Sequence, residues 1–420
     1  DRIEALGDAN IPFIYEKESI GIGNRIKANL KWSTDPANKK RISCYLTELA
    51  LLIRAKVLLD GGDMRKTRLV WFYPLSMQQG NIENIKRTWG QIMKSVFGIE
   101  ATDDNLIQMP ESIAPYYFYK THPDRFKAAA STVASIDIGG GTSDVAVFQE
   151  NSARPTLLTS FRFAANSIFG DAYSDVPQGD TNPMLKKYVT YFKNLFDNDE
   201  DKYGELNGIL DDITAKRKSE DINAFLFSVE NNKATKNNPV FSYNELLNTD
   251  SSRKLLFIYF YVTLIYYVAN MMKKHGLQKP RNVMFSGTGS KVLDIVGSQE
   301  ELDLLTQTII EEIYEEKYDN GAFAVVKEKT RPKQITCQGG LYQVRDKSGM
   351  MQVKEINSEL ADYDNTIRTN FSLINRERTT YADMADVNRR QAIVAEVVEE
   401  VRRYNEFFLG FTSPTDSSWT

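Results

Sequence analysis

Three consecutive glycines between two apolar runs constrain the fold of this 420-residue chain more than any other feature. Residues 137–145 read Asp-Ile-Gly-Gly-Gly-Thr-Ser-Asp-Val, after the apolar run Val133–Ile136 and before the apolar run Val145–Phe148. This pattern predicts two β-strands joined by a turn that carries no side chain at three positions. Glycine adopts backbone angles that other residues avoid, and its bare backbone lets N–H groups approach an anion such as phosphate.

Two aspartates flank these glycines, and they do not fit a site for an anion alone. Asp137 and Asp144 make sense if a divalent cation accompanies the phosphates, because Mg²⁺ prefers carboxylates, waters and phosphate oxygens. The alternative is a plain glycine-rich hairpin capped by two solvated aspartates. The order Asp, three Gly, Thr, Asp favours phosphate binding over that alternative.

The run resembles the second phosphate loop of the superfamily of actin, DnaK-type chaperones and sugar kinases, and its form is closest to that of the chaperones and bacterial actins. The resemblance implies an α/β, two-lobed, ribonuclease H-like fold that holds ATP and Mg²⁺ between its lobes. It implies that Asp137 acts through the waters of the metal. It also implies that the nucleotide phosphates are held by Gly139, Gly140, Gly141, Thr142 and Asp144.

A second segment matches the superfamily upstream of the glycines. Met109–Ala114 reads Met-Pro-Glu-Ser-Ile-Ala and places Glu111 26 residues before Asp137. It is similar to the first connector between the lobes, and is closest to that of the plasmid-segregating bacterial actins. A carboxylate at such a strand-to-helix junction can orient water for attack on the γ-phosphate. The alternative is an acid that favours a helix N-terminus, but the spacing to the glycines favours the catalytic role.

A second glycine turn follows later in the chain. Val283–Val292 reads Val-Met-Phe-Ser-Gly-Thr-Gly-Ser-Lys-Val and resembles the adenosine loop, although Thr288 stands where the family commonly has a glycine. The resemblance implies nucleotide contacts from Gly287, Thr288, Gly289 and Ser290. The alternative is a strand that ends in a glycine-rich turn.

Three weaker matches complete the set. Thr336–Tyr342, with its glycine pair, resembles the second connector, whose small residues would let two helices cross closely and act as a hinge. Tyr73–Ser76 resembles a strand end of the bacterial actins, and Gly170-Asp171 resembles a loop beyond the phosphate turn. Ordinary strand ends remain the alternative for the first two.

The expected organisation has three parts. Residues 1–130 would be the remainder of a first lobe, 131–343 a second lobe with an inserted subdomain at about 175–250, and 344–420 a C-terminal helical region that returns to the first lobe or binds a partner. Apolar periodicity predicts strands at Thr67–Tyr73, Asn105–Met109, Thr156–Ala165, Asn282–Phe285 and Ala322–Val326. It predicts helices at Tyr45–Leu59, Asn81–Val96, Glu111–Tyr119, Leu255–Met272, Glu300–Tyr318 and Arg389–Phe408, after an irregular stretch to about Asn38.

One expected motif is missing. The superfamily opens with a strand hairpin that bears Asp-x-Gly-Thr/Ser, and no such motif precedes Thr67. Either the chain is the C-terminal part of a longer protein or the site is degenerate. The start at Asp1 and the intact Glu111 and Asp137 favour the first explanation.

Composition excludes several classes of function. Net charge is 52 − 56 = −4, and basic runs are short, so nucleic acid is not indicated as a direct partner. The only cysteines are Cys44 and Cys337 and the only histidines His122 and His275, which argues against a zinc site, a disulfide framework and triad catalysis. Unpaired cysteines fit a cytoplasmic protein. Leu255–Met272 is apolar, but its tyrosines suit a buried core helix better than a membrane span.

Three functions remain open from these patterns. The first is an actin-like or DnaK-like ATPase, a hydrolase whose lobe closure switches a protein partner or self-assembly. The second is a catalytically weak nucleotide-binding scaffold, a pseudo-ATPase used for protein interaction. The third is a small-molecule kinase on the same fold. The Met-Pro-Glu-Ser-Ile connector disfavours it and favours water as acceptor, because a kinase usually places an aspartate to deprotonate the substrate hydroxyl.

Overall fold

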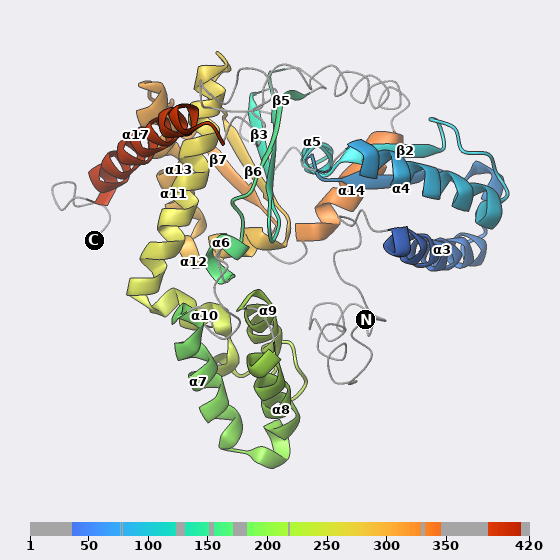
Figure 1. The fold of residues 1–420 in the computed structure, drawn as a ribbon, viewed down its shortest axis with the longest axis horizontal. Coiled ribbons are helices and arrows are strands. Elements are labelled where there is room, and N and C mark those ends of the chain that lie inside the picture. The colour runs from blue at the N-terminus through green and yellow to red at the C-terminus, as the bar shows by residue number, and fades with distance from the viewer. Residues whose placement is uncertain are drawn as a thin grey trace.

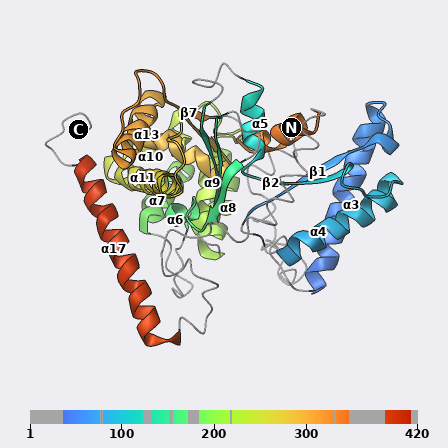
Figure 2. The same ribbon diagram turned by 90° about the horizontal axis from the view of Figure 1, so that it is seen from above.

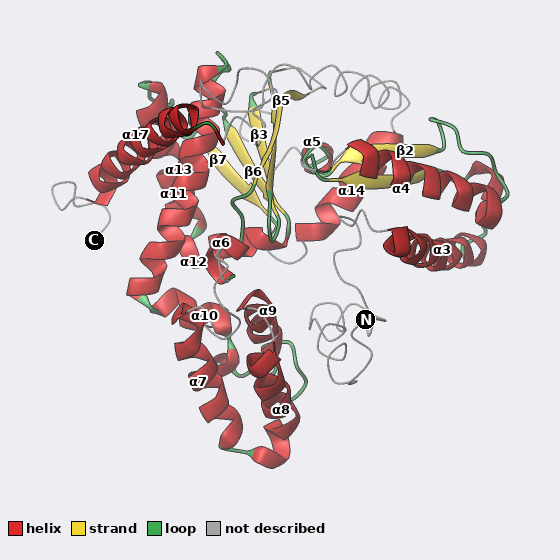
Figure 3. Ribbon diagram, in the orientation of Figure 1, coloured by secondary structure: helices red, strands yellow, loops and turns green. Residues whose placement is uncertain are grey.

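The computed structural model describes residues 36–75, 77, 79–122, 131–150, 155–170, 183–216, 219–328, 332–345 and 385–412. Within these ranges the strands form a two-stranded sheet and a five-stranded sheet, with helices around both (Figure 3). The predicted α/β class is confirmed.

The five-stranded sheet is built on the predicted glycine hairpin. Its strand order is β5-β4-β3-β6-β7. β3 pairs antiparallel with β4, and β4 with β5, whereas β6 is parallel to β3 and β7 is parallel to β6. The bounds are Val133–Ile138 for β3, Ser143–Phe148 for β4, Pro155–Phe161 for β5, Asn282–Ser286 for β6 and Ala324–Lys327 for β7.

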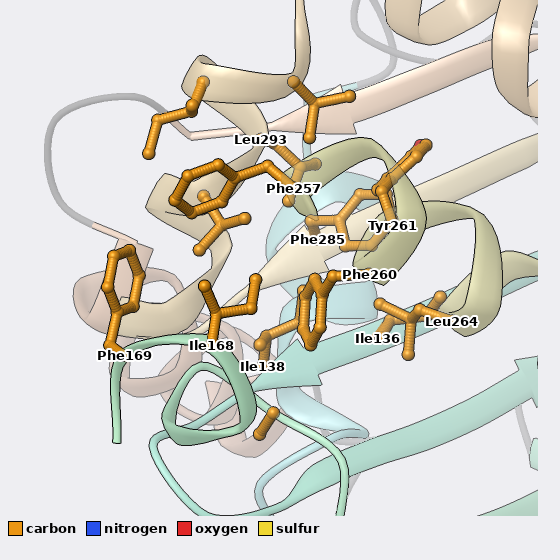
Figure 4. Packing of buried hydrophobic residues seen from close by; sticks show 14 of the residues in the cluster. Ile136, Ile138, Ile168, Phe169, Phe257, Phe260, Tyr261, Leu264, Phe285 and Leu293 are labelled. Atoms are coloured by element: carbon orange, nitrogen blue, oxygen red, sulfur yellow. The ribbon is translucent and has the colours of Figure 1, made fainter. Parts of the chain in front are cut away.

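Long apolar helices cover one face of this sheet. Ile136 and Ile138 of β3 and Phe285 of β6 pack against Phe260 and Leu264 of helix α11, as Figure 4 shows. The helices on this side are α11 (Ser251–Lys274), α12 (Leu293–Val296) and α13 (Gln299–Tyr314). α11 is long and apolar enough to cross a membrane, yet 56% of its most apolar window is buried. The expected core helix is therefore confirmed, and a membrane span is not indicated.

A pair of crossing helices separates the two sheets. Phe118 of α5 (Ala114–Lys120) and Ile335 of α14 (Pro332–Arg345) pack on Met284 in the five-stranded sheet. Ala114 and Val344 of the same two helices pack on the two-stranded sheet. That sheet consists of β1 (Leu69–Tyr73) and β2 (Leu106–Pro110), which run parallel. Figure 1 shows α5 and α14 between the sheets.

The crossing of α5 and α14 is close, as the glycine pair predicted. A Cβ on Gly339 would overlap the carbonyl oxygen of Ala114, and one on Gly340 would lie 2.5 Å from Cζ of Phe72. The axes of α5 and α14 approach this closely only because Gly339 has no side chain, and the lack of a side chain at Gly340 lets α14 lie against Phe72 of β1.

Helices also cover the far face of β1 and β2. Leu69 and Trp71 point to α3 (Pro36–Leu59) and α4 (Gln79–Ile92), where they pack with Trp89. The molecule is thus layered, with α11 and α13, then the five-stranded sheet, then α5 and α14, then β1 and β2, then α4 and α3 (Figure 1). The sequence analysis placed residues up to about Asn38 in an irregular stretch, and this is wrong for residues 36–38, because α3 begins at Pro36.

The expected insertion is a helical projection. It consists of α7 (Pro183–Asp197), α8 (Glu200–Lys216), α9 (Ser219–Val229) and α10 (Tyr243–Thr249), and it extends from the end of the sheet where α6 (Asn166–Phe169) lies (Figure 1). Aromatic side chains fill its core, with Phe196 stacked on Phe241. The remaining short helices are η2 (Met64–Lys66), η3 (Met93–Phe97), η5 (Pro239–Phe241) and η6 (Thr288–Val292).

The C-terminal helix does not lie on the β1–β2 side of the molecule, and the alternative expectation that it binds a partner stays a prediction. α17 (Val387–Thr412) packs through Tyr404 and Phe408 against Tyr259 of α11, on the outer side of the five-stranded sheet. It does not return to the β1–β2 sheet within the described residues. The expectation that it returns to a first lobe is therefore wrong for this part of the chain. The preceding residues 346–384 lie outside the described ranges.

Candidate functional site

The two glycine turns predicted from the sequence touch each other. β3 and β6 are parallel neighbours, so their carboxyl ends lie side by side and each is followed by its glycine turn. Gly287 has φ of +81°, and a Cβ there would overlap the carbonyl oxygen of Ile138. A Cβ on Gly289 would lie 2.6 Å from the carbonyl oxygen of Gly139. Only glycine fits either position, so the second turn can lie directly against the first.

Asp137 is anchored at this junction. It is the penultimate residue of β3, its side chain is buried, and the Ser286 hydroxyl donates a 2.8 Å hydrogen bond to its Oδ2. Strand pairing places Asp137 opposite Ser286 on one side and opposite Asp144 on the other. The position of the carboxylate is therefore fixed by the sheet and not by a flexible loop.

The first glycine turn keeps backbone donors available. Its carbonyl groups are used, because Gly139 accepts from the N–H of Ala165 at 3.2 Å and Gly140 from the N–H of Asn166 at 2.8 Å. The N–H groups of Gly140, Gly141 and Thr142 make no hydrogen bond within the part of the chain that the structure describes. Gly140 and Gly141 are exposed, and a Cβ on Gly141 would meet nothing within 4 Å. Exposed N–H groups of this kind can bind an anion.

Asp144 is a buried acid with an unusual proton affinity. Burial and the negative charges of Asp137 and Glu111 together raise its pKa to about 7, although the nearby Ser160 hydroxyl and the backbone N–H of Leu75 favour the charged form. Its Oδ1 is buried and has no hydrogen-bond partner among the described residues. An orphaned carboxylate oxygen beside an open glycine turn is a place where a cation or a water can bind.

Glu111 reaches the site from the other sheet. It directly follows β2, and its backbone N–H donates to the carbonyl oxygen of Tyr73 at the end of β1 at 3.0 Å. It is half-buried, and its charge acts on Asp144. The site therefore lies between the two sheets, at the carboxyl ends of β2 and β3. The two-stranded sheet contributes the carboxylate of Glu111, and the five-stranded sheet contributes those of Asp137 and Asp144. Within the described ranges, no group of three or more His, Cys, Asp or Glu side chains is arranged to hold a metal by itself.

The second glycine turn has one buried and one exposed hydroxyl side chain. Ser290 is buried, and its hydroxyl donates to the carbonyl oxygen of Gly287 at 2.7 Å, so it shapes the turn. Thr288 is the exposed residue of this turn. Two members of the weaker motifs, Ser76 and Asp171, lie outside the described residues.

Two residues of the site were missed in the sequence analysis. Ser286 closes an apolar strand directly before Gly287, and a polar residue at such a strand end was the available signal. Asn166 binds the backbone of the glycine turn, and its Oδ1 lies 3.3 Å from where a Cβ of Gly140 would be. No local pattern indicated Asn166, because its contact depends on how the loop after β5 folds back.

Comparison of the sequence with protein-family models and with curated proteins finds no match.

Proposed function

We propose that this chain is a nucleotide-binding domain of the actin-like or DnaK-like ATPase type, which binds ATP and Mg²⁺ between two lobes. The lobes would be the β1–β2 side and the five-stranded-sheet side, joined by α5 and α14. The observation that carries the proposal is the exposed glycine turn beside two buried aspartates, with a glutamate facing them from the other sheet.

The residues present fit a magnesium nucleotide. The N–H groups of the glycine turn that make no hydrogen bond can donate to phosphate oxygens. No atom lies within 4 Å of where a Cβ of Gly141 would be, so a phosphate can approach this turn. Asp137 and the orphaned Oδ1 of Asp144 suit the water shell of Mg²⁺, which usually binds proteins through one or two carboxylates and keeps several waters. The metal would supply positive charge against the phosphates. The second turn, Gly287–Ser290, would face the nucleoside side of the ligand.

Glu111 is proposed to orient the attacking water. Its carboxylate follows a strand end that is fixed by the hydrogen bond to Tyr73, so its position depends on the first lobe. The aspartates belong to the second lobe. Hydrolysis would then respond to the distance between the lobes, and closure about α5 and α14 would switch a protein partner or self-assembly in the cytoplasm.

Calorimetric titration of ATP with Mg²⁺ into the chain tests this proposal. We expect micromolar binding that falls at least tenfold in Gly141→Ala and in Asp137→Asn. Gly208→Ala is the matched control, because this exposed glycine in α8 also has nothing within 4 Å and lies far from the site in sequence and structure. Binding that the two site variants leave unchanged would contradict the proposal.

Phosphate release then separates an ATPase from a catalytically weak scaffold. Glu111→Gln keeps the size of the side chain and removes its charge. If the chain is an ATPase, this variant should bind ATP normally and hydrolyse it about 10²-fold to 10⁴-fold more slowly. Binding without turnover in the unmodified chain would favour the scaffold, and phosphate transfer to an added small molecule would favour a kinase.

A further inference from the structure

We propose that Ser135 is a positioning residue for hydrolysis, which holds the backbone beside Glu111 against the lobe that carries Asp137. This inference rests on the proposed ATPase function and adds a residue to its site. The observation that carries it is one buried hydrogen bond, in which the Ser135 hydroxyl donates to the carbonyl oxygen of Ser112 at 3.0 Å. Both serines are fully buried.

Ser135 and Asp137 lie on the same face of β3, the one that α5 covers. Side chains alternate along a strand, and Ile136 between them points to α11 on the other face. Met284, the neighbour of Ser135 on β6, contacts Phe118 of α5. Two residues span about 7 Å of strand, so β3 itself fixes the distance between the loop that Ser135 holds and the carboxylate of the proposed metal site.

A second hydrogen bond holds the same loop from the other sheet. The backbone N–H of Glu111 donates to the carbonyl oxygen of Tyr73 at 3.0 Å, which continues the pairing of β1 with β2. The two held atoms, the nitrogen of Glu111 and the carbonyl oxygen of Ser112, belong to adjacent residues. The side chain of Glu111 therefore leaves the backbone between one contact with each sheet.

The chain that follows this loop belongs to the five-stranded sheet. Ile113 and Tyr117 pack on Ala146 and Phe148 of β4, and Figure 2 shows α5 at the junction between the two sheets. The chain thus passes from one sheet to the other at residues 111 and 112. Both hydrogen bonds can form together only when the two sheets are as close as they are here. Closure of the lobes would therefore be the state in which the glutamate is held in place.

An alternative role for this hydrogen bond is stability alone. A buried hydroxyl and a buried carbonyl oxygen are costly unless they are hydrogen-bonded, so Ser135→Ala should destabilise the fold under either role. A positioning role predicts in addition that turnover falls while ATP affinity does not. A displacement of about 1 Å in a catalytic group can lower the rate about 10²-fold.

Steady-state ATP hydrolysis by the full chain tests the proposal. We expect Ser135→Ala to lower kcat by about tenfold to 10²-fold and to leave the affinity for ATP unchanged. Ser228→Ala is the matched control, because the Ser228 hydroxyl is also buried and donates to a backbone carbonyl oxygen, that of Phe225 at 2.7 Å, but lies in the helical projection. Urea unfolding should show that both variants are destabilised, whereas only Ser135→Ala loses turnover.

A double variant shows whether Ser135 acts through Glu111. Once Glu111→Gln has removed the carboxylate, its position no longer matters, so Ser135→Ala with Glu111→Gln should hydrolyse ATP no more slowly than Glu111→Gln alone. Ser135→Cys keeps a group of similar size with a weaker donor, so it should lower turnover in the same direction, and it replaces Ser135→Ala if that variant does not fold.

The outcomes separate this inference from the ATPase proposal. Turnover that Glu111→Gln lowers and Ser135→Ala leaves unchanged would overturn the role of Ser135 and leave the ATPase proposal standing. Rate losses that multiply in the double variant would also overturn it, because Ser135 would then act independently of Glu111. A chain that binds no ATP, or binds ATP without hydrolysing it, would overturn the ATPase proposal and this inference with it.

Discussion

Ser286 donates a 2.8 Å hydrogen bond to Oδ2 of Asp137, from a position 149 residues further along the chain. The bond joins the ends of two neighbouring parallel strands and lies beneath both glycine turns. It fixes the carboxylate that the proposed magnesium site needs, and it does so in a fully buried place, where an unpaired carboxylate is costly.

Removal of the Ser286 hydroxyl should destabilise the fold and the site together. Ser286→Ala leaves a buried carboxylate oxygen without this donor, so we expect the free energy of unfolding to fall by about 1–3 kcal/mol. Urea unfolding followed by circular dichroism measures the change. Ser252→Ala, at an exposed helix position, is the control and should stay within about 0.5 kcal/mol of the unmodified chain. An equal effect of the two substitutions would show that the hydrogen bond contributes nothing.

The two glycine turns should respond differently to an added methyl group. In Gly287→Ala the new Cβ meets the carbonyl oxygen of Ile138 and the backbone has positive φ, so we expect a loss of stability of about 1–3 kcal/mol or more. In Gly141→Ala the space is open, so the midpoint of thermal unfolding should stay unchanged while nucleotide binding falls. A strongly destabilised Gly141→Ala chain would mean that this turn is structural.

The helix crossing should be the most sensitive glycine contact. A Cβ on Gly339 overlaps the backbone of Ala114, so Gly339→Ala must push α14 away from α5, at a cost of about 3 kcal/mol. Gly208→Ala in the exposed part of α8 should instead stabilise by up to about 1 kcal/mol, because alanine is the better helix former. Chemical unfolding of both variants gives the comparison, and similar values for the two would contradict the packing at the crossing.

Asp144 should make stability depend on pH near neutrality. Its pKa is about 7 in the folded chain and 3.8 for an unperturbed aspartate, so the folded state binds the proton more tightly. The stabilising contribution of the neutral acid is fully present below its ordinary pKa and is lost as the pH rises toward 7, by up to about 4 kcal/mol. Asp144→Asn should remove this dependence. Urea midpoints between pH 4.5 and pH 8 for both chains test it, and parallel pH profiles would show that Asp144 ionises normally.

Magnesium should lower the pH at which Asp144 ionises. A cation near the orphaned Oδ1 favours the charged carboxylate, so binding of Mg²⁺ with nucleotide at pH 6 should release a proton from the unmodified chain but not from Asp144→Asn. Calorimetry in two buffers of different ionisation enthalpy measures that proton. Equal proton release by both chains would place the metal away from Asp144.

The sequence predicted the glycine hairpin well because its signals are local. Continuous apolar runs define β3 and β4, and the three glycines between them leave only a turn. The close crossing at Gly339 was also predictable, because small residues on a helix are a general sign of close approach. The acid at position 111 was placed at a helix start, whereas α5 begins at Ala114 with Pro115 in its first turn. Glu111 therefore belongs to the loop that follows β2.

Other features depend on contacts that a local pattern does not contain. Ser286 matters because strand register sets it opposite Asp137, and the register of β6 on β3 is decided by the whole sheet. The apolar periodicity of Arg389–Phe408 predicted a helix, but periodicity alone does not say which helix its apolar side meets. Its contact with Tyr259 follows from the position of α11, which is more than a hundred residues away in the chain.

The layered arrangement also has a consequence for folding. Glu111, Asp137 and Gly287 lie at or just after the ends of strands that are distant in the chain. α14 must be inserted between the sheets before Glu111 can face the two aspartates. Contacts of such long range form late. A molecule that binds there would therefore bind only fully folded chains. It would raise their free energy of unfolding by RT ln(1 + [L]/Kd), where [L] is its free concentration and Kd its dissociation constant. In a cell, supply of that molecule would act as quality control on the protein.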